Sequence, residues 1–522
     1  MVARVFTFAR CLRTGYVLAR EGALGLIDPQ LLPPSAAAFV RFGRLFERSD
    51  AGDRGTRLRA TLTRLGPTYV KVGQFLATRP DIVGFGIARD LEELQDRVPP
   101  FSREEAIQIV ETSLDRPLNE IFTFFSEPVA AASIAQVHKA QIKNTSADEW
   151  VAVKIIRPGI RLRFDKDLTA MRFTARLVER WGGREAKRFR APEVVETIAR
   201  SIVFEMDMRF EAAGLSELAE NTKNDPDFRV PVPLWDYTSG NILTIEWIDG
   251  IRLNDLEAIN QAGINRSKLA QVVLQSFLRH AIRDGFFHAD MHPGNLFVDN
   301  NGQLIAVDFG IMGRLTRKDR RYLAEILYGF IARDYRRVAE VHFEAGYVPA
   351  DQSVDDFTQA IRAVGEPIHN RNANEFSMAR VLTLLFDITS LFEMHTRTEL
   401  VMLQKTMVVV EGVTRTIDPE INIWKTSEPV VSQWLAEEFG PSAYLEKAEK
   451  GIKSLAGFLA ELPDISQRSL KLFDRIEKLV ETGYLPDGER TKEHAQSNQI
   501  LFKNQTIALW VIAVTLIVIA LK

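Results

Sequence analysis

The sequence predicts an α+β protein built of two lobes, with a helical extension before them and a hydrophobic helix after them. Three observations carry this prediction. Apolar runs of strand length occur between residues 122 and 156, helical apolar spacing dominates from Ser267 onward, and residues 504–521 carry no charge. A strand-rich lobe followed by a helix-rich lobe leaves a cleft between them, and such clefts commonly bind ligands.

The composition excludes several classes of protein. The chain has 522 residues, enough for several packed units, and a formal net charge of -3, whereas a nucleic-acid-binding domain is usually basic. We therefore expect no nucleic-acid partner. Cys11 is the only cysteine, which excludes a disulfide framework and a cysteine-rich metal site.

Residues 1–124 predict a helical extension, because their apolar residues recur at three- and four-residue spacing. Pro67 marks one helix start, and Ser102 followed by Glu105 forms the capping-box pattern of another. The first twenty residues contain arginines and no acidic residue, which favours a basic amphipathic helix on an anionic membrane surface. A docking helix and a mitochondrial transit peptide are the alternatives.

The strand-rich lobe is predicted for residues 125–248 and the helix-rich lobe for residues 249–430. The apolar patterns predict strands at 122–125, 135–142, 150–156, 230–232 and 241–247, and a strand pair within 296–307. They predict helices at 163–180 and 191–219.

Beyond the lobes, residues 431–498 predict helices and a polar linker, and residues 499–522 predict a transmembrane anchor. The uncharged run 504–521 would reach roughly 27 Å as a helix, close to the thickness of a bilayer core. Trp510 would lie near one end, where amphipathic aromatic side chains settle. A buried core helix or an oligomerisation helix is less favoured, because the preceding segment 486–499 is polar and offers no core.

The strongest functional signal is His288-Ala-Asp290-Met-His-Pro-Gly-Asn295 followed by Asp308-Phe-Gly310. Phosphoryl transfer needs one carboxylate to orient or deprotonate the acceptor, and an amide with a second carboxylate to hold Mg²⁺ against the triphosphate. Asp290, Asn295 and Asp308 supply these groups in the order of a protein-kinase-like fold. A lone Asp-Phe-Gly is more often a turn, but together they predict Asp290 as the catalytic residue and Asn295 and Asp308 as Mg²⁺ ligands.

A second signal is Lys154, which ends the stretch Val151-Ala-Val-Lys154 on the predicted strand 150–156. In the kinase-like interpretation this lysine binds the α- and β-phosphates of ATP and pairs with a glutamate on a helix. Glu211 is the predicted partner. Their long separation in sequence implies an inserted helix at about 165–182. The alternative is an exposed strand lysine without a function.

The third signal is an alanine-rich turn where a kinase would have a glycine-rich loop. Alanine restricts the close approach of backbone N–H groups to phosphates that glycine allows, so nucleotide binding should differ in orientation or selectivity. The predicted nucleotide-binding residues of this turn are Ala130, Ala131, Ala132, Ser133, Ala135 and Val137.

A helix is predicted to begin near Thr316, with Asp319 completing an N-cap pattern, only a few residues after Gly310. The Ala-Pro-Glu at residues 191–193 precedes the catalytic motif and cannot close an activation segment. The docking platform for a peptide substrate is therefore missing from the pattern, and we expect no phosphorylation of proteins in trans.

With these motifs in place, the chain resembles the UbiB family of atypical kinases over nearly its whole length. Lys71-Val-Gly-Gln74 matches the KxGQ motif of that family, Glu205-Met-Asp207 matches its ExD motif, and the alanine-rich turn is its third mark. The resemblance implies regulatory roles for Lys71, Gln74, Glu205 and Asp207, with the extension packed over the cleft and Lys71 near the nucleotide. Glu205 and Glu211 are expected about 120° apart on one helix, so that Glu205 pairs with a cation of the extension.

The resemblance also implies an ATP- and Mg²⁺-dependent phosphotransferase or ATPase that supports ubiquinone biosynthesis. Its expected partners are membrane lipids or ubiquinone precursors and other ubiquinone-biosynthesis proteins. Its expected place is the bacterial inner membrane, with the kinase-like domain in the cytoplasm. A small-molecule kinase of the choline or aminoglycoside type and a nucleotide-binding pseudokinase scaffold are the alternatives, and the oligomeric state is left open.

Overall fold

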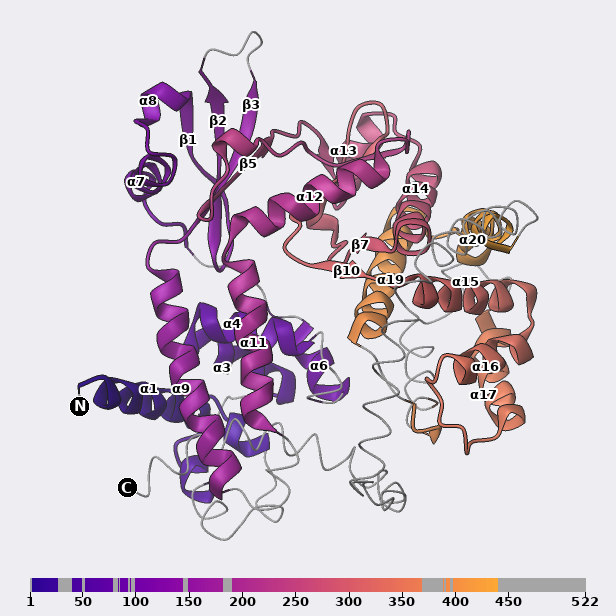
Figure 1. Cartoon of the computed structure of the whole chain (residues 1–522), viewed down its shortest axis with the longest axis horizontal. Coiled ribbons are helices and arrows are strands. Elements are labelled where there is room, and N and C mark those ends of the chain that lie inside the picture. The colour runs from indigo at the N-terminus through magenta and orange to yellow at the C-terminus, as the bar shows by residue number, and fades with distance from the viewer. Residues whose placement is uncertain are drawn as a thin grey trace, which may run out of the picture.

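In the part of the chain that the structure describes, the helices surround three β-sheets (Figure 1). The computed structural model describes residues 2–26, 40–48, 52–77, 83, 85–92, 94, 99–143, 149–181, 190–368, 388, 391–394 and 398–439. The predicted linker and transmembrane anchor at residues 440–522 lie outside this part of the chain.

The first sheet is antiparallel with strand order β1-β2-β3-β5. Its strands are β1 (Phe122–Ala131), β2 (Ala135–Ile142), β3 (Trp150–Ile156) and β5 (Ile242–Glu246). Alternation along β3 buries Val151, Val153 and Ile155 against α7 (Arg103–Leu114) and leaves Lys154 on the other face. The predicted strands 135–142 and 150–156 are confirmed, whereas β1 is longer than predicted and crosses the expected lobe boundary at residue 125.

Two long helices, α9 (Ile160–Trp181) and α11 (Ala191–Glu205), follow β3 and run side by side (Figure 1). α9 corresponds to the helix predicted as an insertion at about residues 165–182. The inner faces of α9 and α11 share an apolar core with the helical extension, to which Val72, Phe164 and Ile202 contribute. The extension contains α1 (Val2–Arg20), η1 (Ala23–Leu26), α3 (Arg54–Leu65), α4 (Pro67–Ala77) and α6 (Phe85–Glu92), followed by α7 and α8 (Leu118–Ile121).

Two helix starts of the sequence analysis are confirmed in this region. α4 begins at Pro67, and Ser102 and Glu105 form the capping box of α7. The single helix predicted for residues 191–219 is wrong, because the chain breaks after Glu205 and restarts as α12 (Met208–Thr222). The physical reason is Asp207, whose side chain accepts a hydrogen bond from the backbone N–H of Arg209 and so caps a new helix.

The second lobe contains a four-stranded sheet of order β4-β9-β8-β6 and a two-stranded sheet of β10 and β7. These strands are β4 (Phe228–Arg229), β6 (Ile251–Arg252), β7 (Phe286–His288), β8 (Leu296–Val298), β9 (Leu304–Ala306) and β10 (Met312–Arg314). The strand predicted at residues 230–232 is misplaced: β4 ends at Arg229. Pro231 and Pro233 have no N–H with which to continue a ladder.

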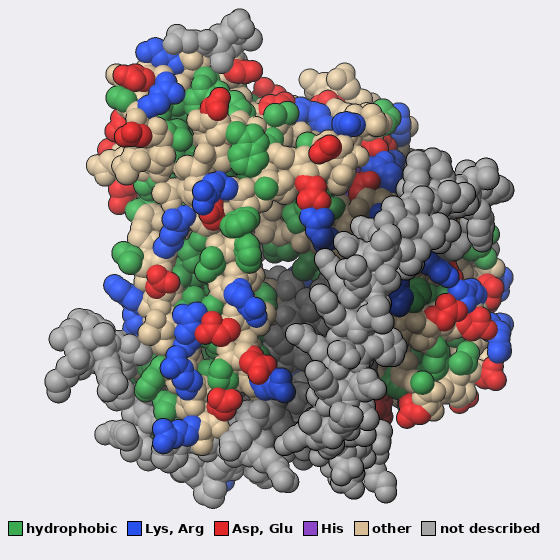
Figure 2. Space-filling model, in the orientation of Figure 1, with side chains coloured by type: hydrophobic (Ala, Val, Ile, Leu, Met, Phe, Trp, Pro, Cys, Tyr) green, Lys and Arg blue, Asp and Glu red, His purple; other side chains and the backbone are tan. Residues whose placement is uncertain are grey.

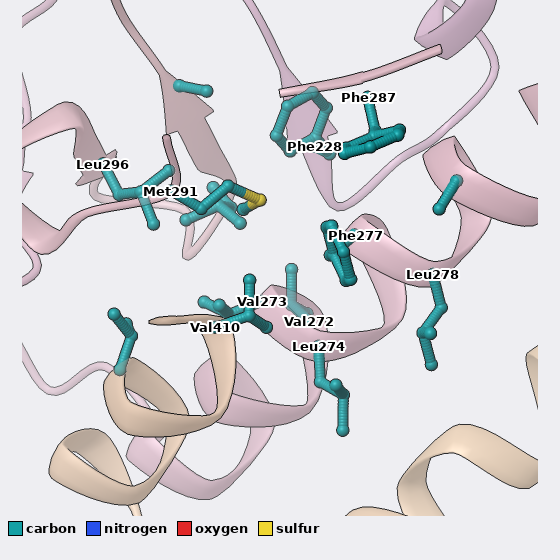
Figure 3. Close-up of a cluster of buried hydrophobic side chains, with 14 of the residues drawn as sticks. Phe228, Val272, Val273, Leu274, Phe277, Leu278, Phe287, Met291, Leu296 and Val410 are labelled. Atoms are coloured by element: carbon teal, nitrogen blue, oxygen red, sulfur yellow. The ribbon is translucent and has the colours of Figure 1, made fainter. Parts of the chain in front are cut away.

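Helices make up the rest of the second lobe. They are α13 (Leu256–Gln261), α14 (Arg266–Leu278), α15 (Arg317–Ala332), α16 (Tyr335–Glu344), α17 (Val354–Ile368), α19 (Thr398–Ile417) and α20 (Ile423–Phe439). Short turns of helix are η3 (Trp235–Tyr237), the π-helix η4 (Arg279–Asp284) and η5 (Pro293–Asn295). Figure 3 shows Val273 and Phe277 of α14, Val410 of α19 and Met291 of the loop after β7 in one buried cluster.

The visible face over α9 and α11 carries interspersed basic and acidic side chains (Figure 2). Among the residues that the structure describes, no helix has both the length and the apolar character needed to cross a bilayer. The uncharged run 504–521 is not part of that set, so the anchor stays a prediction.

Candidate active site

The His288-Ala-Asp290 motif lies where β7 ends, and two contacts fix its shape. The His288 side chain is buried, and its Nδ1 accepts a hydrogen bond from the backbone N–H of Asp290 at 3.0 Å. The ring proton is therefore on Nε2, which faces the carbonyl oxygen of Val307 at 3.3 Å. Asn295 Nδ2 lies 3.1 Å from both the backbone oxygen and Oδ2 of Asp290, so the amide orients the exposed carboxylate.

Lys154 joins the two lobes at this place. Its Nζ lies 2.7 Å from Oε1 of Glu211 on α12 and 3.0 Å from Oδ1 of Asp308 in the loop after β9. The same Glu211 oxygen accepts the backbone N–H of Phe309 at 3.2 Å. The predicted Lys154–Glu211 pair is thus confirmed as a contact, and a strand, a helix and a loop meet in one charged cluster.

Asp308 has an unusual backbone. Its φ is +63°, in the left-handed region that residues other than glycine rarely adopt. Its carboxylate holds the turn together, because Oδ1 accepts the backbone N–H of Gly310 at 3.4 Å as well as Lys154. Such a conformation costs about 1–3 kcal/mol and persists where the surroundings enforce it, which is common at functional sites.

The charges in the cluster shift one another's pKa values. Lys154 holds the pKa of Asp308 well below its usual range, against the opposing effect of partial desolvation. Burial lowers the pKa of Lys154, but the charges of Asp308 and Glu211 more than offset it, so that the pKa lies above its ordinary value. Burial raises the pKa of Glu211 although Lys154 opposes the rise. Lys154 is therefore cationic and Asp308 anionic at neutral pH.

The ExD motif spans the break between α11 and α12. Glu205 ends α11, so it does not share a helix with Glu211 and the expected angle of 120° does not apply. Asp207 caps α12 and pairs with Arg209 at 2.6 Å instead of joining the Lys154 cluster. Glu205 on α11 and Glu211 on α12 thus belong to different helices, and only Glu211 pairs with Lys154.

Lys71 reaches this break from the extension. Its Nζ lies 3.3 Å from Oε2 of Glu205, the cation–carboxylate contact that the sequence predicted. The Lys71 cation also lowers the pKa of Asp308, which places Lys71 within electrostatic reach of that carboxylate. Gly73 lets α4 come close to its neighbours, because a Cβ there would lie 2.6 Å from Leu62 and 2.4 Å from Leu94. Gln74 occupies a half-buried position on the same helix.

The alanine-rich turn connects β1 and β2. The backbone N–H of Ala132 donates to the carbonyl of Ala135 at 2.8 Å, and Ser133 is fully buried. Ala130 pairs with Val137, and Val137 in turn pairs with Lys154, so the turn extends over the lysine. Positive φ values of non-glycine residues occur elsewhere in the described chain but not in this turn, which therefore needs no glycine.

Some contacts around the site were missed by the sequence analysis. Arg157, just past β3, donates from Nε and Nη2 to the carbonyl of Ala132 at 3.0 and 2.9 Å and so fixes the turn. Thr406 of α19 donates a hydrogen bond to the carbonyl of Ala289 at 3.1 Å. This bond connects α19 to the loop after β7, which carries Asp290. An arginine shortly after the lysine strand is a weak signal for the first contact, and nothing in the sequence signals the second.

The segment between Gly310 and the next helix, α15, is short, as predicted. β10 follows at Met312, and α15 begins with Thr316 as N-cap and Asp319 completing a capping box. The predicted helix start is confirmed, and few residues separate it from the Asp308 turn.

The donor set suits Mg²⁺ better than a tightly caged metal. Among the described residues, no three His, Cys, Asp or Glu side chains converge as a metal-binding group. Mg²⁺ is usually held by one or two carboxylates together with waters and substrate phosphates. The exposed carboxylate of Asp308 and the amide oxygen of Asn295 fit that pattern.

A hollow of about 650 Å³ lies elsewhere, between α15 and α20. Arg321, Glu325 and Arg337 line one side of it, and Leu435 lines the other. These residues already form ion pairs with one another and with Glu344, such as Arg321 Nε to Glu325 Oε1 at 2.7 Å. The hollow is lined by none of the predicted site residues, so it is separate from the Lys154 cluster.

Comparisons with known proteins agree with this fold. Residues 93–342 match the ABC1 atypical kinase-like domain, and residues 361–422 match the UbiB helical domain. A solved structure of Rv3197 with erythromycin from Mycobacterium tuberculosis has a TM-score of 0.51 and 23% identity, covering 71% of this chain and 93% of that chain. The fold is that of an atypical kinase.

Curated relatives narrow the class further. A protein named "Probable protein kinase UbiB" in Marinobacter nauticus is 41% identical to this chain, over 80% of this chain and 76% of the relative. A protein of the same name in Azotobacter vinelandii is 39% identical, over 87% of this chain and 84% of the relative. A relative of the same name in Tolumonas auensis is 36% identical over 95% of this chain and 92% of its own. The chain belongs to the UbiB family of atypical kinases.

Proposed function

We propose that this protein binds ATP with Mg²⁺ and supports ubiquinone biosynthesis at a membrane. It does so by hydrolysing ATP or by transferring a phosphoryl group from it. The observation that carries the nucleotide part is the cluster in which Lys154 contacts both Glu211 and Asp308. A lysine held by a helical glutamate next to an exposed aspartate is the arrangement that kinase-like phosphoryl transfer uses. Membership of the UbiB family supports the assignment to the quinone pathway.

Each residue has a defined task in this proposal. Lys154 binds the α- and β-phosphates while Glu211 holds its ammonium group in place. Asn295 and Asp308 hold Mg²⁺, which neutralises charge on the phosphates when bound. Asp290, whose carboxylate Asn295 orients, accepts the proton of the attacking hydroxyl or water.

The acceptor is proposed to be water or a small molecule rather than a protein. The few residues between Gly310 and Thr316 leave little chain for a peptide-docking segment. We expect no phosphate incorporation into a peptide library by the purified protein, and robust incorporation would contradict this part of the proposal.

The membrane part rests on the sequence. The uncharged run 504–521 is proposed to anchor the chain in the bacterial inner membrane with the kinase-like domain in the cytoplasm. Ubiquinone precursors are strongly apolar, so a factor that handles them, or the enzymes that act on them, benefits from this location. The proposed partners are therefore membrane lipids or ubiquinone precursors and other proteins of the pathway.

The test compares Lys154→Ala with Lys223→Ala, an exposed lysine at the end of α12. For the purified full chain in detergent with Mg²⁺, removing one member of a desolvated charge cluster should weaken ATP binding by about 30-fold or more. Lys223→Ala should bind like the wild type in the same calorimetric titration.

A deletion strain complemented with each variant tests the pathway. The Lys154→Ala strain should accumulate an early prenylated phenol, and the Lys223→Ala strain should not. Normal quinone in both strains would refute the pathway assignment, and a wild-type protein without affinity for adenine nucleotides would refute the whole proposal. Loss of quinone in Asp308→Asn with the protein complex still assembled would favour nucleotide turnover over a scaffold role.

A further inference from the structure

One buried carboxylate outside the nucleotide site is shared by three helices. Asp167 of α9 is 5% exposed, and both of its oxygens are occupied. Its Oδ1 accepts a hydrogen bond from the Arg10 guanidinium of α1. Its Oδ2 accepts the hydroxyl of Thr68, on the first turn of α4, at 2.6 Å. None of the sequence motifs includes this residue.

The position of Thr68 connects this carboxylate to the cleft. Thr68 is fully buried and lies three residues before Lys71, so the two side chains are neighbours on one face of α4. Lys71 in turn pairs with Glu205 at the break before α12. Whatever holds Thr68 therefore also determines where the Lys71 ammonium lies.

α9 holds the start of α4 at a second point. Arg163, one turn before Asp167, donates from Nη2 to the carbonyl of Leu65 at 3.3 Å. Its guanidinium lies over Gly66, where φ is +107° and an added Cβ would be 2.0 Å from Nη2. The turn between α3 and α4 thus has little room to shift relative to α9.

α1 contributes a parallel contact. The hydroxyl of Tyr69, next to Thr68, lies 2.9 Å from that of Thr14, and Thr14 in turn donates to the carbonyl of Arg10. Burial raises the pKa of Tyr69 to about 12, so its hydroxyl stays protonated and can donate. Tyr69 is therefore tied directly to α1, and Thr68 is linked to α1 through Asp167.

We propose that Asp167 is a positioning residue that fixes the Lys71 helix over the cleft and so sets nucleotide affinity through Lys71. A buried carboxylate with partners on two other helices specifies their relative position, because shifting either helix leaves charge or hydroxyl groups unpaired. The inference rests on the proposed nucleotide site. It assigns the site a control point on α9, outside the Lys154 cluster.

The test is a double-mutant cycle in the full chain in detergent, with Mg-ADP titrated by calorimetry. Asp167→Asn should weaken Mg-ADP binding by about fivefold, the size expected for directly coupled residues, because the Lys71 cation moves away from the phosphate site. Lys71→Ala should show a loss of similar size. In the Lys71→Ala background, Asp167→Asn should add less than about twofold.

Two further variants test the same contacts in case Asp167→Asn does not fold. Thr68→Val removes the hydroxyl with little change of shape, and Arg10→Gln changes a partly exposed side chain. Both should weaken Mg-ADP binding in the same direction as Asp167→Asn. The matched control is Glu196→Gln, which breaks the exposed Arg172–Glu196 pair between α9 and α11 and should leave affinity unchanged.

Wild-type affinity in both Asp167→Asn and Thr68→Val, or a full further loss in the Lys71→Ala background, would overturn the positioning role. Amide hydrogen exchange provides a readout that needs no nucleotide. Asp167→Asn should speed exchange across α4 and leave β3 and α12 as in the wild type. If the wild type bound no nucleotide, the proposed function would fail while this exchange experiment still decided the role of Asp167.

Discussion

At the scale of single residues, the site depends on a lysine with two carboxylate partners of unequal exposure. The Glu211 side chain is 9% exposed and that of Asp308 is 49% exposed. Exposed ion pairs contribute little, whereas desolvated pairs are costly to break. Glu211 is therefore suited to hold Lys154 permanently, and Asp308 is suited to exchange its lysine contact for a metal.

The corresponding prediction concerns Glu211→Gln. Loss of the buried partner should lower kcat/KM for ATP hydrolysis by about 30-fold or more, following the cost of truncating a buried charge pair. The control on the same helix is Glu217→Gln, which disrupts an exposed pair with Arg314 at 2.7 Å. Steady-state kinetics that show equal rates for the two variants would contradict the role of Glu211.

The main residues of the candidate active site could be predicted from the sequence, but the residues that support them could not. Asp290, Asn295, Asp308 and Lys154 belong to motifs with fixed spacing, so their types and order were informative. Arg157 and Asp167 act through single contacts between segments far apart in sequence, and no local pattern signals such a contact.

At the scale of elements, capping patterns located the helix starts that they marked, whereas apolar spacing alone did not show where one helix ends and the next begins. The capping residues Ser102 and Thr316 mark their helices correctly, because a cap is a local hydrogen bond. The break at Asp207 was missed, although aspartate favours N-cap positions and Glu211 follows in the first turn. Apolar spacing continues through the break, and this continuity hid the change of direction.

The tight packing of α4 gives a prediction at this scale. Gly73→Ala should destabilise the protein by about 1–3 kcal/mol, because the new methyl group would clash with Leu62 and Leu94. Gly412→Ala is the matched control: nothing lies within 4 Å of its added Cβ on α19, so it should be neutral or stabilising by up to about 1 kcal/mol. Denaturant unfolding measures both, and similar values would show that α4 is not closely packed at Gly73.

At the scale of the whole molecule, the sequence predicted two lobes, an extension and an insertion, but not how they are joined. Contacts that decide the assembly link distant segments: Lys71 with Glu205, Thr406 with Ala289. Family resemblance implied the first of these and nothing implied the second. α19 thus contacts the loop after β7 directly through Thr406, and substitutions in α19 should affect the stability of the folded protein.

Glu411 of α19 is such a place. Its side chain is 6% exposed, Oε1 accepts no hydrogen bond within the described part of the chain, and Arg415 Nη1 is 3.9 Å away. Burial raises the pKa of Glu411 to about 7, with Arg415 opposing the rise. Between its ordinary pKa and about 7 the folded state binds a proton that the unfolded state has lost. Folding stability must therefore fall as the pH rises through this window.

Glu411→Gln should remove that dependence. Relative to the wild type, the variant should gain about 2–3 kcal/mol of stability between pH 5 and pH 8, the part of the linkage from a pKa rise of 4.5 to about 7 that falls within this pH range, at 1.36 kcal/mol per pH unit. Denaturant unfolding at both pH values gives the difference, and Glu220→Gln, an exposed change on α12, should show none. Because the wild type loses stability while the unfolded chain ionises and the folded carboxyl group keeps its proton, the advantage of the variant must be small at pH 5 and larger at pH 8. A variant with the same advantage at both pH values would mean that Glu411 is ionised throughout and balanced by Arg415.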